Sequence, residues 1–255
     1  QKQRNIRINI IVQIIHSLKR LFNHIQSLIG WRINNMVSKK KAMEFIDTID
    51  LMFPDAECEL HANNPFELTI AVLLSAQCTD ALVNKVTPNL FNKYKTPEDY
   101  LSVELEELQQ DIRSIGLYRN KAKNIQKLSQ ILIDQYNGQI PSSRDELVKL
   151  PGVGRKTANV VTSVAFNEPQ IAVDTHVERV SKRLGICRYK DDVLTVEKTL
   201  QKVIPVERWS KTHHQLIFFG RYHCLARNPK CRECPLLNEC REGQKRLRKG
   251  LVKID

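Results

Sequence analysis

One lysine of this sequence is a candidate nucleophile because it directly follows a glycine-containing turn and begins a predicted helix. Lys156 lies in the string LPGVGRKTA (150–158), at the predicted first turn of a helix. A free lysine has a pKa of about 10.4 and must lose its proton before it can attack. The positive end of the helix dipole and the neighbouring Arg155 both disfavour the ammonium form. Lys156 is therefore a candidate for Schiff-base formation with a sugar carbon, with a phosphate contact as the alternative.

A carboxylate follows this lysine further along the chain. Asp174, in the string IAVDTHV (171–177), stands between apolar residues and a predicted helix, which is a position typical of an N-cap. Beside a sugar that loses its base, the same carboxylate would stabilise developing positive charge or prepare the nucleophile. The two roles are compatible. His176 is less clearly functional, because a place in a polar core or a phosphate contact explains it as well as a catalytic role does.

The glycine turn before Lys156 also predicts a grip on DNA. It joins two short helices as a helix–hairpin–helix, at about residues 144–166, and its glycines permit positive φ and the close approach of another backbone. The N–H groups that open the second helix suit a phosphate. An ordinary helical corner is the alternative. The backbone contacts that we expect, without base reading, come from Gly152, Val153, Gly154, Arg155 and Thr157.

Two other side chains stand in predicted turns. Gln77 follows an apolar helix in the string LSAQCTD, where it is either a cap or loop contact, or fills the gap left by a nucleotide rotated out of the duplex. Leu117, in IGLY, precedes a helix. An exposed apolar residue in a turn can wedge between bases, and simple packing is its alternative.

Four of the seven cysteines crowd together near the C-terminus, which argues against a secreted disulfide scaffold. Four thiolates hold either a [4Fe–4S] cluster or a structural zinc ion, and the spacing does not choose between them. Arg227 and Lys230 lie in the loop within this pattern, where they would meet DNA phosphates. The predicted ligands are Cys224, Cys231, Cys234 and Cys240.

Helical periodicity dominates the elements that must position these residues, and no alternating strand pattern is visible, so we expect an all-α fold. Gly185 is a suitable residue to end the last of these helices. The predicted helices are a segment through Met43–Met52 that Pro54 stops, Phe66–Ala76, one helix from Pro97 through Leu108, Arg119–Tyr136, a short helix ending at Leu150, Lys156–Phe166 and Thr175–Leu184.

Composition favours a globular protein with a polyanionic partner. The formal net charge is +12 and 42% of the residues are hydrophobic. Residues 1–35 supply six of these charges and contain no acidic residue, so they form a basic extension. This segment is either an upstream extension of the reading frame before Met36, a targeting or membrane-surface helix, or a DNA-binding arm. No apolar run is long enough to span a membrane.

Five ordered strings resemble the endonuclease III family, the bifunctional DNA glycosylases and AP lyases of the helix–hairpin–helix superfamily. The resemblance covers roughly Lys40 to Gly243. The strings are PFELTIAVLLSAQCTD, IGLYRNKAKNI, LPGVGRKTANVV, IAVDTHVERV and the four-cysteine pattern.

The resemblance implies two helical lobes with DNA bound in the cleft between them. The first would be a six-helix barrel at about 58–168, and the second would join 36–57 to 169–243 and carry a structural [4Fe–4S] cluster. Residues 244–255 would form a basic tail, and the basic extension has no counterpart in the family pattern. We expect a monomer in a bacterial cytoplasm, associated with the nucleoid.

The resemblance also implies a reaction. Lys156 would be the nucleophile and Asp174 its essential carboxylate, with Gln77 and Leu117 inserted into duplex DNA. An oxidised or otherwise damaged pyrimidine would leave, a Schiff base would form at the sugar C1′, and β-elimination would cut the strand 3′ to the abasic site. Abasic sites themselves would also be substrates.

Two other functions are weighed against this one. The related adenine glycosylases have a glutamate in the helix that here holds Val72, and they lack a lysine at the position of Lys156. A non-catalytic helix–hairpin–helix module needs the glycines and basic residues but neither Lys156 nor Asp174. The two residues together at family spacing favour the enzyme.

Overall fold

The described part of the chain is built from helices. The computed structural model describes residues 36–252, and within that range it contains no β-strand. The basic extension, residues 1–35, lies outside the described residues. No described helix is long and apolar enough to cross a membrane. The α-helices are α2 (Lys39–Met52), α3 (Pro65–Ser75), α4 (Asp80–Lys93), α5 (Pro97–Ser102), α6 (Leu105–Asp111), α7 (Tyr118–Tyr136), α8 (Arg144–Leu147), α9 (Arg155–Phe166), α10 (Thr175–Leu184), α11 (Val193–Val203), α12 (Trp209–Phe218) and α13 (Arg241–Arg248).

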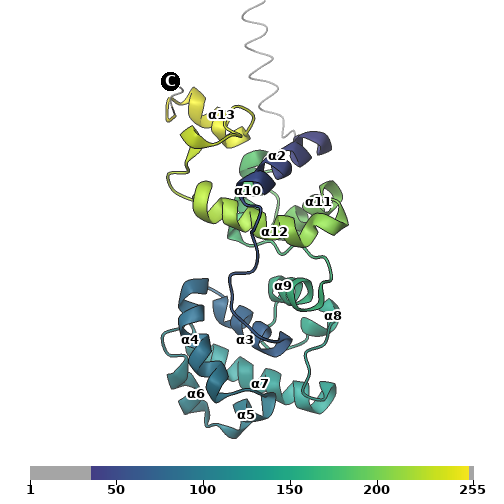
Figure 1. The fold of residues 1–255 in the computed structure, drawn as a ribbon, viewed down its shortest axis with the longest axis vertical. Helices are drawn as coiled ribbons and strands as arrows, with labels where there is room; N and C mark the ends of the chain where they lie inside the picture. The colour runs from purple at the N-terminus through teal and green to yellow at the C-terminus, as the bar shows by residue number, and fades with distance from the viewer. Residues whose placement is uncertain (1–35, 253–255) are drawn as a thin grey trace, which may run out of the picture.

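Helices α3 to α9 form one lobe, drawn in blue and teal in the lower half of Figure 1. Its centre is α3, which is buried from Phe66 to Leu74 and contacts α4, α7 and α9. The Asn64 side chain accepts a hydrogen bond from the Glu67 N–H, and Pro65 occupies the first turn, so local signals start this helix. A helix that is apolar on all sides is stable only when others surround it.

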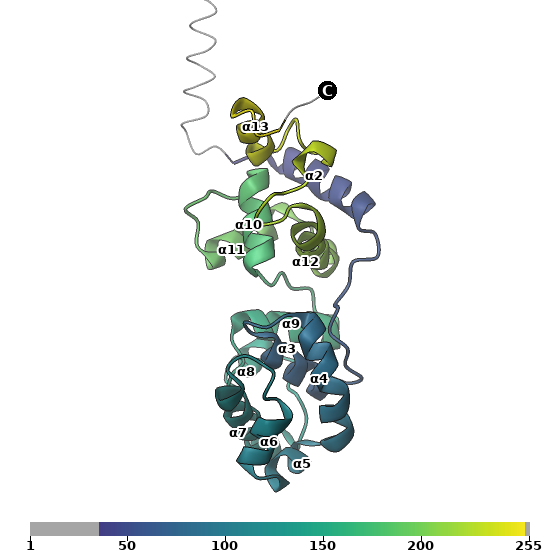
Figure 2. The same cartoon turned by 90° about the vertical axis from the view of Figure 1, so that its left-hand side faces the viewer.

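The second lobe joins the two ends of the described chain. Helix α2 packs against α11 and α12, and the buried side chains Phe45, Ile46 and Ile49 belong to the same apolar cluster as Val177 and Leu216. Figure 2 shows α2 beside α12, with α10, α11 and α13 in the same half of the molecule. Helix α2 therefore folds onto elements more than a hundred residues away in sequence.

Two segments cross between the lobes. Residues 53–64 lead from α2 to α3, and residues 167–174 lead from α9 to α10; both are visible as thin connections in Figures 1 and 2. The second segment is the shorter, and its residues Ile171, Ala172 and Val173 are buried. As a result, the end of α9 and the beginning of α10 lie at the junction of the lobes.

The helix predicted from Pro97 through Leu108 is wrong as a single element. The structure ends α5 at Ser102 and starts α6 at Leu105. The reason is tertiary: the Gln126 side chain on α7 donates hydrogen bonds to the carbonyls of Tyr100 (3.1 Å) and Val103 (2.9 Å), which satisfies the backbone where the helix breaks.

Helix α4 was not predicted. Pro88 lies within it, and a proline normally breaks a helix because it lacks an N–H and clashes with the preceding turn. The helix forms because it packs against α3 and buries Val83, Leu90 and Phe91. By contrast, α10 has the predicted bounds and ends as expected at Gly185, whose φ is +89°.

Candidate active site

The hairpin between α8 and α9 uses its two glycines differently. Gly152 has a φ of +79°, and a Cβ placed on it would lie 2.9 Å from a Leu73 methyl carbon and 3.0 Å from the Asn124 amide nitrogen. Gly154 has an ordinary φ of −85°, and nothing would lie within 4 Å of its Cβ. The first glycine is thus required by the fold, whereas the second leaves open space at the start of α9.

The N-terminus of α9 presents backbone donors. Its N-cap is Gly154, which has no side chain to accept a hydrogen bond, and the first N–H that the helix uses internally is that of Ala158. The three preceding N–H groups, from Arg155 to Thr157, are therefore left by the helix to other acceptors. They carry the partial positive charge of the helix dipole, as a phosphate site requires.

Val153 does not fit its predicted DNA contact. Its side chain is buried, and its N–H donates to the Leu150 carbonyl at 3.0 Å. A phosphate accepts hydrogen bonds, so a residue whose donor is already used offers it nothing. Val153 instead anchors the hairpin in the core of its lobe.

Four of the predicted site residues line one cavity of about 640 Å³ at the junction of the lobes. Lys156 comes from the first turn of α9, and Asp174 from the N-cap of α10 in the other lobe. Gln77 contributes from the turn after α3, and His176 from the first turn of α10. The cavity therefore joins the amine and the carboxylate, which are eighteen residues apart in sequence.

Asp174 is an N-cap, as its position in the sequence predicts. Its Oδ1 accepts hydrogen bonds from the backbone N–H groups of His176 and Val177, both at 2.8 Å. The His176 ring is oriented in turn, because its Nδ1 lies 3.1 Å from Arg179 Nη2. An arginine can only donate, so Nδ1 is the acceptor and a neutral His176 carries its proton on Nε2.

Asp80 and Arg221 line the same cavity but were not predicted. Arg221 Nη2 donates to Asp80 Oδ2 at 2.9 Å, and Arg221 Nη1 pairs with Glu59. Burial raises the pKa of Asp80, an effect that nearby Lys156 opposes. Arg221 lies in the π-helical segment Phe219–His223, and such segments often occur at functional sites. The sequence signal was weak, since Asp80 ends the string LSAQCTD, where no helix was predicted to follow.

Two more lining residues limit the chemistry of the cavity. Val72 is buried on α3 and presents an apolar side chain to the cavity. His213, on α12, is buried, and burial holds its pKa well below the ordinary value. His213 is therefore neutral at physiological pH.

Gln77 and Leu117 share an unusual backbone conformation. Their φ angles are +56° and +60°, both side chains are exposed, and Leu117 is 55% exposed. A Cβ on Gly116 would lie 3.6 Å from the Gln77 carbonyl oxygen, so the two turns are adjacent. Lys121 links the two turns. It lies on α7, just after Leu117, and its buried Nζ donates to the carbonyls of Leu74 (2.9 Å) and Ala76 (2.6 Å), just before Gln77. Leu117 does not line the cavity, but stands at its edge on the neighbouring turn.

The side chain of Arg155 forms an ion pair within the protein. Its Nε and Nη2 donate to the two carboxylate oxygens of Glu197 on α11, at 3.0 and 2.5 Å. Two of its three nitrogens are thus committed to an ion pair between the lobes. The Arg155 side chain is thus largely committed within the protein, whereas its backbone N–H at the start of α9 stays open to a phosphate.

The four C-terminal cysteines line one small cavity of about 20 Å³, whose other walls include Leu184, Phe219 and Leu237. As the side chains are placed, no three His, Cys, Asp or Glu residues of the described chain stand close enough together to hold a metal ion. The donor set itself, four thiols around a common space, fits either an iron–sulfur cluster or zinc.

Arg183 supports the loop that follows Cys224, donating to the carbonyls of Leu225 (2.6 Å) and Ala226 (2.9 Å). Arg227 and Lys230 are exposed on that loop.

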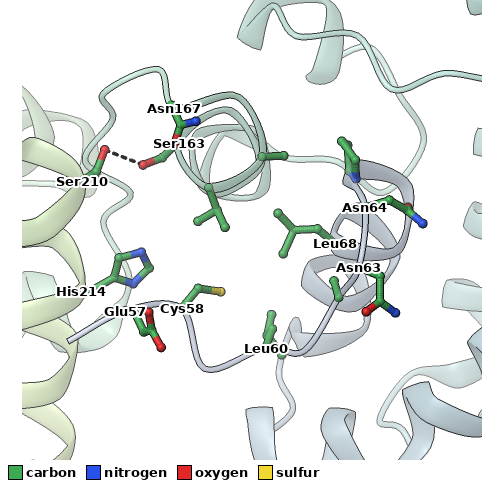
Figure 3. A pocket seen from close by; sticks show the side chains of 14 residues that line it. Glu57, Cys58, Leu60, Asn63, Asn64, Leu68, Ser163, Asn167, Ser210 and His214 are labelled. Atoms are coloured by element: carbon green, nitrogen blue, oxygen red, sulfur yellow. Dashed lines mark hydrogen bonds between the residues drawn. The ribbon is translucent and has the colours of Figure 1, made fainter. Parts of the chain in front are cut away.

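A second cavity, of about 550 Å³, lies on the other side of the 57–60 segment and shares Cys58 and Leu60 with the first. Figure 3 shows its polar lining, with His214 facing it from α12 and a hydrogen bond between Ser163 on α9 and Ser210. This bond joins the lobes at the far end of α9 from Lys156. The two cavities therefore flank a single segment at the lobe junction.

Comparison with protein families matches residues 70–206 to the HhH-GPD superfamily of base excision DNA repair proteins. The chain is 74% identical over 214 residues to endonuclease III of Bacillus subtilis (strain 168), an alignment that covers 84% of this chain and 98% of the relative. It is 46% identical over 209 residues to endonuclease III of Escherichia coli (strain K12), covering 82% of this chain and 99% of that one.

Solved structures agree with these relatives. A trapped endonuclease III–DNA covalent intermediate is similar with a TM-score of 0.82 and 70% identity, over 83% of this chain and 100% of that chain. A non-covalent endonuclease III–DNA complex gives a TM-score of 0.82 at 69% identity, over 84% and 100%. A thermostable thymine-DNA glycosylase is more distant, with a TM-score of 0.74 at 27% identity, over 81% and 98%.

Proposed function

The chain belongs to the endonuclease III family within the HhH-GPD superfamily of base excision DNA repair proteins, and from this membership we propose which residues carry its chemistry. The protein is a DNA glycosylase and AP lyase that acts on duplex DNA. Lys156 is the nucleophile, Asp174 is its carboxylate partner, and damaged pyrimidines are the bases released.

The observation that carries this assignment is that Lys156 and Asp174 line one cavity although they come from different lobes. A lysine that served only as a phosphate contact would need no carboxylate beside it. The covalent DNA intermediate trapped with a 70% identical protein supports a nucleophile of this kind. Val72 supports the choice against adenine glycosylase chemistry, because it leaves no carboxylate at that position of the cavity.

The reaction follows from the chemistry of an amine at a sugar carbon. The lone pair of neutral Lys156 Nζ bonds to C1′ while the N-glycosidic bond breaks, and the base leaves with the electrons of the broken bond and takes up a proton. The C1′–O4′ bond of the sugar then breaks and one nitrogen proton moves to O4′, which gives the protonated Schiff base. Loss of a C2′ proton expels the 3′ phosphate by β-elimination, and water releases Lys156. The Asp174 carboxylate stabilises positive charge on the sugar during base loss.

Backbone and side-chain contacts hold the DNA in this scheme. The free N–H groups at the start of α9, with Gly152 and Gly154 beside them, bind phosphate, and exposed Arg227 and Lys230 bind it on the other lobe. Gln77 and Leu117 enter the duplex where the damaged nucleotide leaves it, and the exposure of both side chains supports this. His176, one of the α10 residues that line the cavity, contacts the DNA backbone.

The four cysteines are the ligands of a [4Fe–4S] cluster in this proposal, with zinc as the alternative. When bound, the cluster cross-links the basic 225–230 loop to the start of α13 and has a structural role. Iron and sulfide analysis with a visible absorption spectrum separates the two metals. Zinc without iron or sulfide in freshly purified protein would refute the cluster.

Borohydride trapping on DNA with an abasic site tests the nucleophile. Reduction fixes the Schiff base, so the wild-type protein should form a covalent protein–DNA adduct. Lys156→Gln should form none, because an amide is not nucleophilic, while its affinity for the same DNA changes by less than about tenfold, the effect of one phosphate contact. Adduct formation by Lys156→Gln at the wild-type level would assign the chemistry to another amine.

A further inference from the structure

Glu197, on α11, is a buried carboxylate with an unusual set of partners. Its side chain is 2% exposed, yet both of its oxygens accept hydrogen bonds from Arg155, at 3.0 and 2.5 Å. Asn159 Nδ2 adds a third contact, at 3.4 Å from Oε2. A buried carboxylate is tolerated only with partners of this quality, because its desolvation costs several kcal/mol.

These partners lie beside the nucleophile. Arg155 and Asn159 are one turn apart on the same face of α9, and Arg155 is the immediate neighbour of Lys156. Asn159 Nδ2 also lies 3.3 Å from the Ile171 carbonyl oxygen, in the segment that leads to Asp174. One carboxylate of the second lobe therefore fixes both the first turn of α9 and, through Asn159, the connection to α10.

The contact of Glu197 with Arg155 and Asn159 matters for the proposed pair of Lys156 and Asp174. Lys156 and Asp174 belong to different lobes, so their separation depends on how the lobes are placed relative to each other. Resting on the roles proposed above for these two residues, we propose that Glu197 is a positioning residue that sets this placement through Arg155 and Asn159. The Arg155 side chain then serves the reaction by its ion pair across the lobes, and only its backbone N–H is left for DNA phosphate.

The two roles of Arg155 predict different effects. If Arg155 bound phosphate, its removal would weaken DNA binding and lower the salt dependence by about one contact, and the removal of Glu197 would free Arg155 and tighten binding. If Glu197 positions the helix, either removal slows the chemical step and leaves affinity nearly unchanged. Displacements of about 1 Å at a reacting centre cost on the order of a hundredfold in rate.

The experiment measures single-turnover Schiff-base trapping on abasic DNA and, separately, affinity for DNA with a stable abasic analogue at several salt concentrations. Glu197→Gln and Arg155→Met should each slow trapping, by on the order of tenfold to a hundredfold. The double variant should be no slower than the slower single variant, because the two side chains act as one unit. Arg155→Lys keeps the charge but loses the paired geometry, so it should slow trapping without losing affinity.

Ser210→Ala is the matched control. It removes a different hydrogen bond between α9 and the second lobe, the contact of Ser210 with Ser163 (2.7 Å, Figure 3), at the end of the helix far from Lys156. Trapping by this variant should stay within about twofold of wild type. If Glu197→Gln does not fold, as thermal unfolding will show, Arg155→Lys carries the test.

Wild-type trapping by Glu197→Gln, or by Arg155→Lys where the former does not fold, would overturn the proposal. So would a loss of DNA affinity and of one salt-dependent contact in Arg155→Met with an unchanged trapping rate. Failure of the proposed function looks different, because the wild-type protein itself would then form no adduct, or Lys156→Gln would form one.

Discussion

Asp174 shows how one side chain serves both the fold and the site. Both hydrogen bonds that cap α10 fall on its Oδ1. The cap therefore does not use Oδ2, which leaves this oxygen for the cavity that Asp174 lines. Capping fixes the orientation that the proposed catalytic role requires.

Asp174→Asn should separate these two roles. Asparagine caps a helix about as well as aspartate, so the free energy of unfolding should change by less than about 1 kcal/mol. The negative charge is lost, however, and single-turnover base release should slow by about a hundredfold or more. Urea unfolding and base-release kinetics measure the two effects. If Asp174→Asn releases the base as fast as wild type, Asp174 acts only as the N-cap of α10.

The elements explain why the hairpin needs both of its glycines. Gly152 is left-handed and a Cβ on it would meet Leu73 and Asn124, whereas a Cβ on Gly154 would face open space at the N-terminus of α9. Two neighbouring glycines are thus needed for different reasons: Gly152 for its positive φ and crowded surroundings, and Gly154 for the access of a phosphate.

Alanine at the two glycines should have different effects: mainly on stability at Gly152 and mainly on DNA binding at Gly154. Gly152→Ala should lower the free energy of unfolding by about 1–3 kcal/mol, because φ is +79° and the methyl group meets Leu73 and Asn124. Gly154→Ala should cost less than about 1 kcal/mol of stability but weaken DNA binding. Thermal unfolding and DNA titration check the pair. Equal affinity of Gly154→Ala and wild type would place the phosphate elsewhere.

Lys121 connects the two turns that carry Gln77 and Leu117. Burial lowers the pKa of Lys121, and its Nζ donates to two carbonyls at the end of α3. Lys121→Met should leave both carbonyls without this donor and reduce stability by about 1–3 kcal/mol. It should also weaken binding to DNA with a flipped nucleotide more than binding to intact duplex, because the inserted turns lose their support.

Lys123→Met is the control, since Lys123 is exposed on the same helix. Its stability and its preference for flipped DNA should match wild type. Urea unfolding and titrations with both DNAs provide the comparison. If Lys121→Met keeps the wild-type preference for DNA with a flipped nucleotide, the two turns hold their shape without the Lys121 side chain.

The whole molecule is two apolar cores with a polar junction. Each core is separate, whereas the contacts between the lobes include ion pairs and hydrogen bonds such as Arg155 to Glu197 and Ser163 to Ser210. The cavity that Lys156 and Asp174 line and the second cavity both lie at this junction. The stability of the junction therefore depends on the ionisation of its buried groups.

His214 makes this dependence testable. Burial lowers its pKa from 6.5 to about 4, so between these pH values the unfolded chain binds a proton that the folded protein does not. Stability should therefore fall as pH drops from 6.5 toward 4, with about 3 kcal/mol from His214 over that range. Buried His213 acts in the same direction.

His214→Gln removes this titration. Its free energy of unfolding, measured by urea at pH values from 4 to 7, should fall less steeply on acidification than that of wild type. The difference in slope should approach one proton, or about 1.4 kcal/mol per pH unit. Identical slopes for the two proteins would show that His214 binds its proton equally well in the folded and unfolded states.

The sequence by itself determined the all-α fold, the bounds of α10 and the residue types available for chemistry. Local patterns sufficed there, because helix periodicity, caps and glycine turns act within a few residues. Only the tertiary structure decided that Lys156 and Asp174 share a cavity, that Arg155 binds a carboxylate 42 residues away, and that α5 and α6 are separate. Such contacts depend on which side chains the packed helices bring together, and no local pattern encodes that placement.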